Sequence, residues 1–285
     1  MRTIALTILT MIAFAANSVL CRIALGNELI DAATFTTIRL GSGALSLLVI
    51  LYLKQPQYFE KLSIKTFNFS SSFSLFLYAI CFSYAYIEIS TGTGALILFG
   101  TVQLTMIVAG IVKGEKPTLT VWTGTTLAFG GLVYLILPGV DAPSSVNAIL
   151  MAMSGFAWAI YTLRGRKSAN PIADTTWNFV GTLPFIALTS AVAATAFSTT
   201  LQGIILAIAS GAIASGMGYA IWYTVLPSLS RTVAAIVQLS VPTIAAFGGV
   251  IFMLEPFSTR LILASIATLG GIAMVIYAKR PANKN

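Results

Sequence analysis

Long apolar runs separated by short polar breaks fill the whole sequence. Ten of these runs approach or exceed the ~20 residues that a membrane-spanning helix needs. Because the breaks are short, consecutive helices are expected to run antiparallel, and no soluble domain fits between them. The pattern predicts an all-α polytopic membrane protein with ten transmembrane helices. The expected spans are Thr3–Cys21, Thr34–Leu53, Asn68–Ile87, Thr91–Val112, Leu119–Leu137, Asn147–Leu163, Asp174–Phe197, Leu201–Val225, Thr232–Leu254 and Arg260–Ala278.

The amino-acid composition is also typical of a membrane protein. Apolar residues make up 57% of the chain and charged residues 8%, whereas a soluble domain carries roughly 25% charge. A water-soluble fold needs polar cover that this chain lacks. The chain has no histidine, which excludes zinc hydrolase sites and histidine proton relays. Cys21 and Cys81 lie inside apolar runs and form no metal-like pair. No enzyme activity, metal or cofactor is therefore expected.

The basic residues predict how the chain is oriented, because cytoplasmic loops carry an excess of lysine and arginine. With the N-terminus inside, all but three of the 16 basic residues fall on the cytoplasmic side. Arg22 and Arg260 would lie outside, and Arg39 lies within a span. We expect a multi-pass protein of the cell (inner or plasma) membrane with both termini cytoplasmic. The net charge of +8 reflects this topology, and no nucleic acid partner is expected because no soluble basic face exists.

The two halves of the sequence resemble each other at an offset of 140 residues. The repeat predicts two five-helix units, residues 1–140 and 141–285, around a central cavity. Because five is odd, the second unit must be inverted relative to the first, as in secondary transporters whose substrate site lies near the midplane. The residues that match without a gap are Ser90, Ala95, Ile111, Glu115, Gly130, Gly131 and Ile136, which fall on Ser230, Ala235, Ile251, Glu255, Gly270, Gly271 and Ile276.

Several short motifs together are typical of one transporter family. They are the segments Gly155–Tyr161 and Gly218–Trp222, Pro242 in the ninth span, and two turns that contain glutamate and proline, Glu115-Lys116-Pro117 and Glu255-Pro256. The chain that carries them resembles the EamA-type transporters of the drug/metabolite transporter superfamily over its whole length. The resemblance implies that four helices of each half surround the cavity and the fifth packs outside. Similar members export amino acids or related amphipathic metabolites, among them the aromatic amino acid exporters. Phe14 departs from the family pattern, which has tryptophan there.

Polar and aromatic side chains inside the spans fall on single helical faces, because residues three or four apart lie on one side of a helix. We expect these faces to converge on a cavity with aromatic walls and a few hydrogen-bonding groups. Each ring could instead be ordinary packing or part of an interfacial belt, and each amide could instead bond neighbouring helices. The candidate cavity residues are Asn17, Tyr78, Phe82, Thr101, Trp158, Tyr161, Tyr219, Trp222 and Gln238.

Arg39 is the cation that lies well inside a span. It stands five residues, or ~7.5 Å at the helical rise, from the start of its span. Two interpretations stay open at this point. The side chain could snorkel to the nearer interface, or its guanidinium could pair with a substrate carboxylate.

The acidic residues favour transport without ion coupling. Proton- and sodium-driven carriers usually bury an acid or a histidine in the membrane, but every acid here falls in a break or at a span end. We therefore expect facilitated diffusion or exchange by alternating access. The eight acids are Glu28, Asp31, Glu60, Glu88, Glu115, Asp141, Asp174 and Glu255.

Other functions explain the sequence less well. An intramembrane enzyme lacks its catalytic groups, and a channel lacks rings of charge or a carbonyl filter. A nucleotide-sugar or sugar-phosphate carrier of the same superfamily would need more cavity cations than Arg39. A multidrug exporter of aromatic cations stays open because aromatic faces attract cations. The sequence thus predicts a secondary transporter of small amphipathic molecules in the lipid bilayer, and export is what the resemblance implies.

Overall fold

The computed structural model describes residues 2–60, 68–139, 142–165, 168–229, 234 and 237–278.

Polar side chains in the short segments between the apolar runs cap the helices that follow them. Asp31 accepts a hydrogen bond from the backbone N–H of Thr34 at 2.9 Å, and Asn68 accepts one from Ser71 at 3.0 Å. Such caps satisfy the free N–H groups of a helix start. They fix where the second and third long helices begin.

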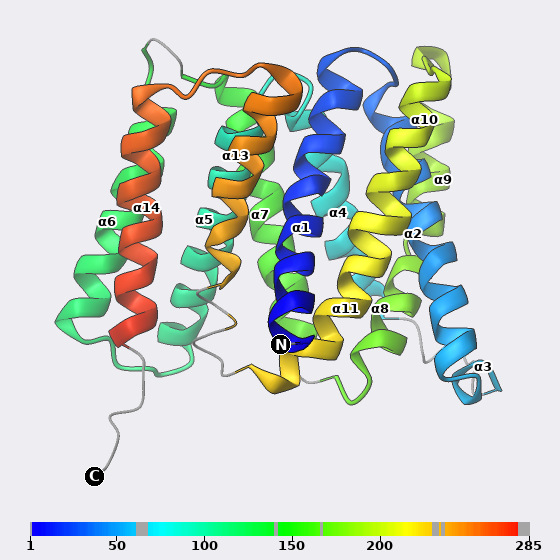
Figure 1. Ribbon diagram of the computed structural model, residues 1–285, viewed down its shortest axis with the longest axis horizontal. Helices are drawn as coiled ribbons and strands as arrows, with labels where there is room; N and C mark the ends of the chain where they lie inside the picture. The colour runs from blue at the N-terminus through cyan, green and yellow to red at the C-terminus, as the bar shows by residue number, and fades with distance from the viewer. Residues whose placement is uncertain are drawn as a thin grey trace.

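The described chain is helical, and its isolated β-bridge joins Ile30 and Thr199. Figure 1 shows the helices running up and down in one bundle, with α6 and α14 at one edge. The start of α1 and the end of α14 lie at the same end of the bundle (Figure 1). The helices are α1 (Arg2–Gly26), α2 (Ala32–Lys54), α3 (Gln57–Glu60), α4 (Phe69–Ala85), α5 (Thr91–Val112), α6 (Leu119–Ile136), α7 (Ser145–Gly165), α8 (Pro171–Val180), α9 (Leu183–Val192), η2 (Ala194–Ala196), α10 (Leu201–Ile208), η3 (Ala209–Met217), α11 (Gly218–Val225), η4 (Leu226–Ser228), α13 (Ser240–Met253) and α14 (Thr259–Ala278).

The helix count differs from the ten uninterrupted spans that the sequence predicts. Seven described helices are long and apolar enough to cross a membrane by length and composition, counting Leu201–Ser228 as one. The predicted third and ninth spans correspond to the shorter helices α4 and α13. The predicted seventh span is divided into α8 and α9, because Pro184 lies in the first turn of α9 and its ring cannot follow an uninterrupted helix. Part of the ninth span, residues 232–233 and 235–236, lies outside the described residues.

Small residues bring α6 and α14 into close contact at the edge of the bundle. A Cβ atom on Gly124 would meet the carbonyl oxygen of Gly271, and one on Gly131 would meet Thr268. Gly130 and Gly270, the other members of the glycine pairs, have open space beside them. Close backbone approach of this kind is how membrane helices gain packing energy without help from water.

A π-helical segment, η3, packs equally closely against α2. A Cβ on Gly211 would press on the carbonyl oxygen of Arg39 and on the hydroxyl of Ser42. Ser46 on α2 donates a hydrogen bond to the carbonyl oxygen of Ala212 at 3.2 Å. Carbonyls along a π-helix are displaced from the α-helical pattern, and such segments often occur near functional sites. The contact holds η3 beside the buried residue Arg39.

One end of the bundle is held by an ion pair between distant parts of the chain. Arg22 Nε donates to Glu255 Oε1 at 3.0 Å, and Arg22 Nη1 donates to the carbonyl oxygens of Tyr86 and Ile87. Glu255 Oε2 accepts from the backbone N–H of Thr91 at 2.8 Å, at the start of α5. We call these contacts the clasp. It joins α1, α4, α5 and the turn between α13 and α14.

Replacing Gly211 with alanine is expected to destabilise the protein, because α2 and η3 would have to separate. Overpacking of this kind costs roughly 1–3 kcal/mol, and thermal unfolding in detergent should show a lower midpoint. Gly130→Ala is the matched control, since its new methyl group meets open space and alanine favours helix over glycine. Equal midpoints for the two variants would contradict the close packing described above.

Candidate functional site: an aromatic cavity

A cavity with aromatic walls lies between α1, α4, α5, α7, η3 and α11. Six of the nine cavity residues predicted from helical spacing line it, namely Asn17, Tyr78, Phe82, Trp158, Tyr219 and Gln238. The other lining residues are Phe14, Ser18, Leu98, Phe99, Ala214 and Ser215. Helices from both halves of the sequence therefore supply the walls.

The aromatic rings form a continuous series around this cavity. The ring centroids of Tyr78 and Trp158 are 4.8 Å apart, and those of Trp158 and Tyr219 are 5.3 Å apart in a stacked arrangement. Phe14 meets Tyr219 edge-on at 5.7 Å, and Tyr78 meets Phe82 at 5.5 Å. Ring pairs at these separations attract each other beyond simple burial. The walls can therefore hold a flat apolar group between aromatic faces.

The remaining three predicted cavity residues lie outside the lining. Thr101 sits against Gly155, where α5 approaches α7. Tyr161 packs on Trp158 at 5.4 Å and accepts a hydrogen bond from Asn178 at 3.4 Å. Trp222 meets Phe14 at 6.1 Å. These residues support the cavity from behind.

The cavity is closed in this conformation. The volume open to the centre of a water molecule is about 20 Å³, little more than one water requires. The rings of Tyr78, Trp158 and Tyr219 occupy the space that a bound molecule would need. A molecule of amino acid size would enter only after the surrounding helices separate.

A hydrogen-bond network beside the cavity centres on the hydroxyl of Tyr78. That oxygen accepts from Arg39 Nη2 at 2.8 Å and from Asn17 Nδ2 at 3.3 Å. Asn17 Oδ1 in turn accepts from the hydroxyl of Ser210 at 2.5 Å, and Ser154 donates to the Tyr78 carbonyl at 2.9 Å. Asn17 therefore lines the cavity and also forms hydrogen bonds to neighbouring helices. The two roles that the sequence left open for this amide, a cavity group and a link between helices, are both observed.

Arg39 is buried in the bundle and does not snorkel to an interface. Arg39 is only 1% exposed. The central carbon of its guanidinium, Cζ, lies 5.2 Å from the ring centre of Tyr78 and 4.7 Å from that of Phe82. It stands behind these two rings, one layer away from the cavity lining. Arg22 and Glu255 form an ion pair at 3.0 Å, whereas no ion pair of Arg39 is found among the described residues. Arg39 therefore lacks a carboxylate partner within the described part of the chain.

The family model described as the EamA-like transporter family matches residues 1–137 and 146–277. The chain belongs to this family. The resemblance to EamA-type transporters of the drug/metabolite transporter superfamily is thereby confirmed, and the chain is a multi-pass membrane transporter with a small-molecule substrate.

Relatives of this EamA-like transporter are found in bacteria and archaea. It is 45% identical over 279 residues to Uncharacterized protein PA1977 of Pseudomonas aeruginosa, covering 96% of this chain and 94% of that one. It is 25% identical over 194 residues to a protein named Uncharacterized transporter from Archaeoglobus fulgidus, covering 64% and 66% of the two chains. A crystal structure with 15% sequence identity matches with a TM-score of 0.61 over 96% of this chain and 99% of that chain, which shows a shared fold.

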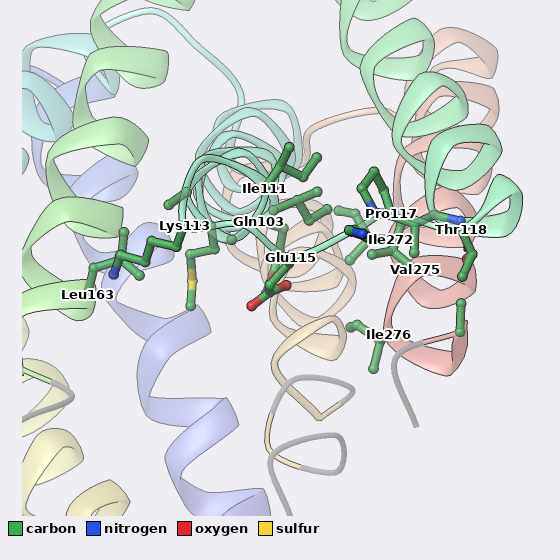
Figure 2. A pocket seen from close by; sticks show the side chains of 17 residues that line it. Gln103, Ile111, Lys113, Glu115, Pro117, Thr118, Leu163, Ile272, Val275 and Ile276 are labelled. Carbon is green, nitrogen blue, oxygen red and sulfur yellow. Dashed lines mark hydrogen bonds between the residues drawn. The ribbon is translucent and has the colours of Figure 1, made fainter. Parts of the chain in front are cut away.

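A larger hollow lies elsewhere in this EamA-like transporter, where α5, α6 and α14 meet at one end of the bundle. Figure 2 shows Leu163 and Lys113 on one side of it and Pro117 and Thr118 on the other, with Glu115 between them. Its volume by the same measure is about 550 Å³. This hollow shares no lining residue with the aromatic cavity, so the two are separate spaces within the described part of the chain.

The described acidic residues all lie away from the aromatic cavity. Glu88 is exposed and accepts a hydrogen bond from Asn147 at 2.6 Å, and Asp174 is exposed in the first turn of α8. Glu255 belongs to the clasp. Two further acids, Glu60 and Asp141, fall where no side chain is described. Among the described residues, the cavity lining therefore contains amides, hydroxyls and rings, but no carboxylate.

Cysteine labelling can test the assignment of the cavity without knowledge of the substrate. In a background where Cys21 and Cys81 are replaced by alanine, a Ser215→Cys thiol should react with a small neutral thiol reagent whenever the cavity opens. Thr268→Cys is the control, since its side chain is fully buried between α14 and α6, away from the cavity lining. We expect reaction at position 215 to be at least about tenfold faster, a difference of ~1.4 kcal/mol in barrier. Equal rates would place the opening elsewhere.

Proposed function

We propose that this EamA-like transporter carries amino acids or related small amphipathic metabolites across the cell membrane, in the export direction, by alternating access to the aromatic cavity. The observation that carries the proposal is the lining of this cavity. Stacked rings accept an apolar side chain, while Asn17, Gln238 and the Tyr78 hydroxyl offer hydrogen bonds to a polar end. Facilitated diffusion or exchange fits the absence of acids among the described lining residues.

Alternating access requires two halves that can move against each other, and we propose that residues 1–140 and 141–285 are inverted repeats. The turn between α5 and α6 lies at the opposite end of the bundle from the turn between α13 and α14 (Figure 1). The backbone N–H of Glu115 bonds the carbonyl of Gly110 at 3.1 Å, and that of Glu255 bonds Gly249 at 3.2 Å. The two family matches, 1–137 and 146–277, support the same division.

Both termini are proposed to lie in the cytoplasm of a cell whose inner or plasma membrane holds the protein. Support comes from the position of the first residues of α1 and the last of α14 at one end of the bundle (Figure 1). The basic residues of the sequence give the sign of the orientation.

The alternative cargoes agree less well with the described cavity. An aromatic cation would lie near the positive charge of Arg39, which contacts the rings of Tyr78 and Phe82. A nucleotide sugar or sugar phosphate would bring two or more negative charges, and Arg39 is the cation beside the described lining. Neutral or zwitterionic molecules match the cavity better than either.

Counterflow in proteoliposomes tests the transport proposal. Purified protein, loaded with an unlabelled amino acid, should accumulate the labelled form transiently, and a panel should favour amino acids with apolar or aromatic side chains. Because the described lining has no acid, an imposed pH gradient should leave the initial rate within about twofold. Trp158→Ala should lower the rate by roughly twofold to tenfold, since one ring pair contributes ~0.5–1.5 kcal/mol beyond burial.

Thr101→Ala serves as the control for the counterflow experiment, because it shortens a polar side chain that lies outside the lining. Accumulation of substrate driven by the pH gradient would contradict uncoupled transport. Unchanged kinetics in Trp158→Ala would remove the aromatic cavity from the mechanism.

The inverted arrangement predicts that the two glutamate turns face opposite sides of the membrane. In the same cysteine-free background, Lys116→Cys should react with a membrane-impermeant reagent from one side and Ser258→Cys from the other. Sealed vesicles of known orientation provide the measurement, with and without permeabilisation. Labelling of both positions from the same side would disprove the inversion.

A further inference from the structure

The walls around the aromatic cavity contain more hydrogen-bond donors than acceptors to receive them. Arg39 Nε and Nη1 are buried and have no hydrogen-bond partner. The hydroxyl of Ser215, which lines the cavity, is also buried without a partner. A buried polar group that lacks a partner is costly. Three unused donors close to one cavity therefore indicate that an acceptor is supplied from outside the described chain.

Tyr78 presents a further donor at the cavity surface. A phenolic oxygen can accept two hydrogen bonds and donate one. Arg39 and Asn17 occupy both acceptor positions, at 2.8 and 3.3 Å. The proton of the hydroxyl is then left to bond a third group, and Tyr78 lines the cavity. Donation by a guanidinium also polarises the hydroxyl and makes it a stronger donor.

The charge of Arg39 adds an electrostatic requirement. A cation held away from water is stable only when paired, and within the described chain Arg39 has aromatic rings and one hydroxyl for partners. Rings beside a guanidinium replace part of its lost hydration, but they carry no net negative charge. An anion bound next to Tyr78 would complete the neutralisation.

We propose that the cavity recognises the carboxylate of its substrate through the Tyr78 hydroxyl, backed by the positive charge of Arg39, while Trp158 and Tyr219 hold the apolar side chain. This inference deepens the proposed function and rests on it, because it names the required group of the cargo. The substrate class is then small monocarboxylates with an apolar or aromatic side chain. Arg39 is a positioning residue, since it acts through Tyr78.

The test compares three probes with the same aromatic side chain in counterflow: an amino acid, its carboxamide, which has nearly the same size, and its decarboxylated amine. We expect the unmodified protein to prefer the acid by about tenfold to a hundredfold, the range for hydrogen bonds to charged groups. Tyr78→Phe should bring the ratio of acid to amide close to one. Arg39→Lys keeps the charge but loses the planar fork, and it should reduce the preference only in part.

A second variant guards against misfolding. Tyr78→Phe alone leaves the Arg39 charge with fewer partners, whereas Arg39→Met combined with Tyr78→Phe removes charge and donor together. Apolar replacement of a buried polar pair is often tolerated, so the double variant should fold, which thermal unfolding in detergent checks, and it should carry the acid and the amide at similar rates. Tyr161→Phe is the matched control, because it deletes a buried hydroxyl outside the lining and should keep the preference for the acid.

The outcomes separate this inference from the proposed function. Equal transport of acid and amide by the unmodified protein, or an unchanged ratio in Tyr78→Phe, would overturn carboxylate recognition and leave transport intact. Absence of flux for all three probes would overturn the proposed function as well.

Discussion

The hydroxyl of Tyr78 is the point at which three helices share hydrogen bonds. It belongs to α4 and accepts from Arg39 on α2 and Asn17 on α1. Through Asn17 the network reaches Ser210 on η3, and the Tyr78 carbonyl accepts from Ser154 on α7. In lipid, each of these polar groups would be costly alone. Their mutual satisfaction therefore fixes how the helices around the cavity approach one another.

Close backbone contacts make that network reachable. Gly211 and Gly216 leave room for α2 to lie directly against η3, which brings the Arg39 side chain inward and away from lipid. The same principle operates at the edge of the bundle, where glycines on α6 and α14 face each other. Hydrogen bonding and small-residue packing thus act together. A short side chain on one helix allows a neighbouring helix to come close enough for hydrogen bonds between them.

Much of the cavity could be predicted from helical periodicity, and the exceptions have physical causes. Asn17, Tyr78, Phe82 and Trp158 lie on regular helices, so residues three and four apart point the same way. Trp222 follows the π-helical segment η3, whose wider turns depart from the 3.6-residue spacing on which the prediction of the cavity faces depends. Leu98, Phe99 and Ala214 line the cavity with side chains that look like any lipid-facing residue. Pro184 predicts a disturbed helix in the seventh span, but the sequence does not distinguish a bent helix from two separate helices.

The clasp has a consequence for how the bundle responds to its surroundings. The side chains of Arg22 and Glu255 are 17% and 12% exposed, so dissolved salt reaches them and screens their attraction. The pair is partly buried, and Glu255 also accepts a hydrogen bond from the backbone N–H of Thr91 at the start of α5, where a negative charge is favourable. Conformations that separate the two side chains therefore become less costly as ionic strength rises. The stability of that end of the bundle therefore depends weakly on the electrolyte in the solution that it faces.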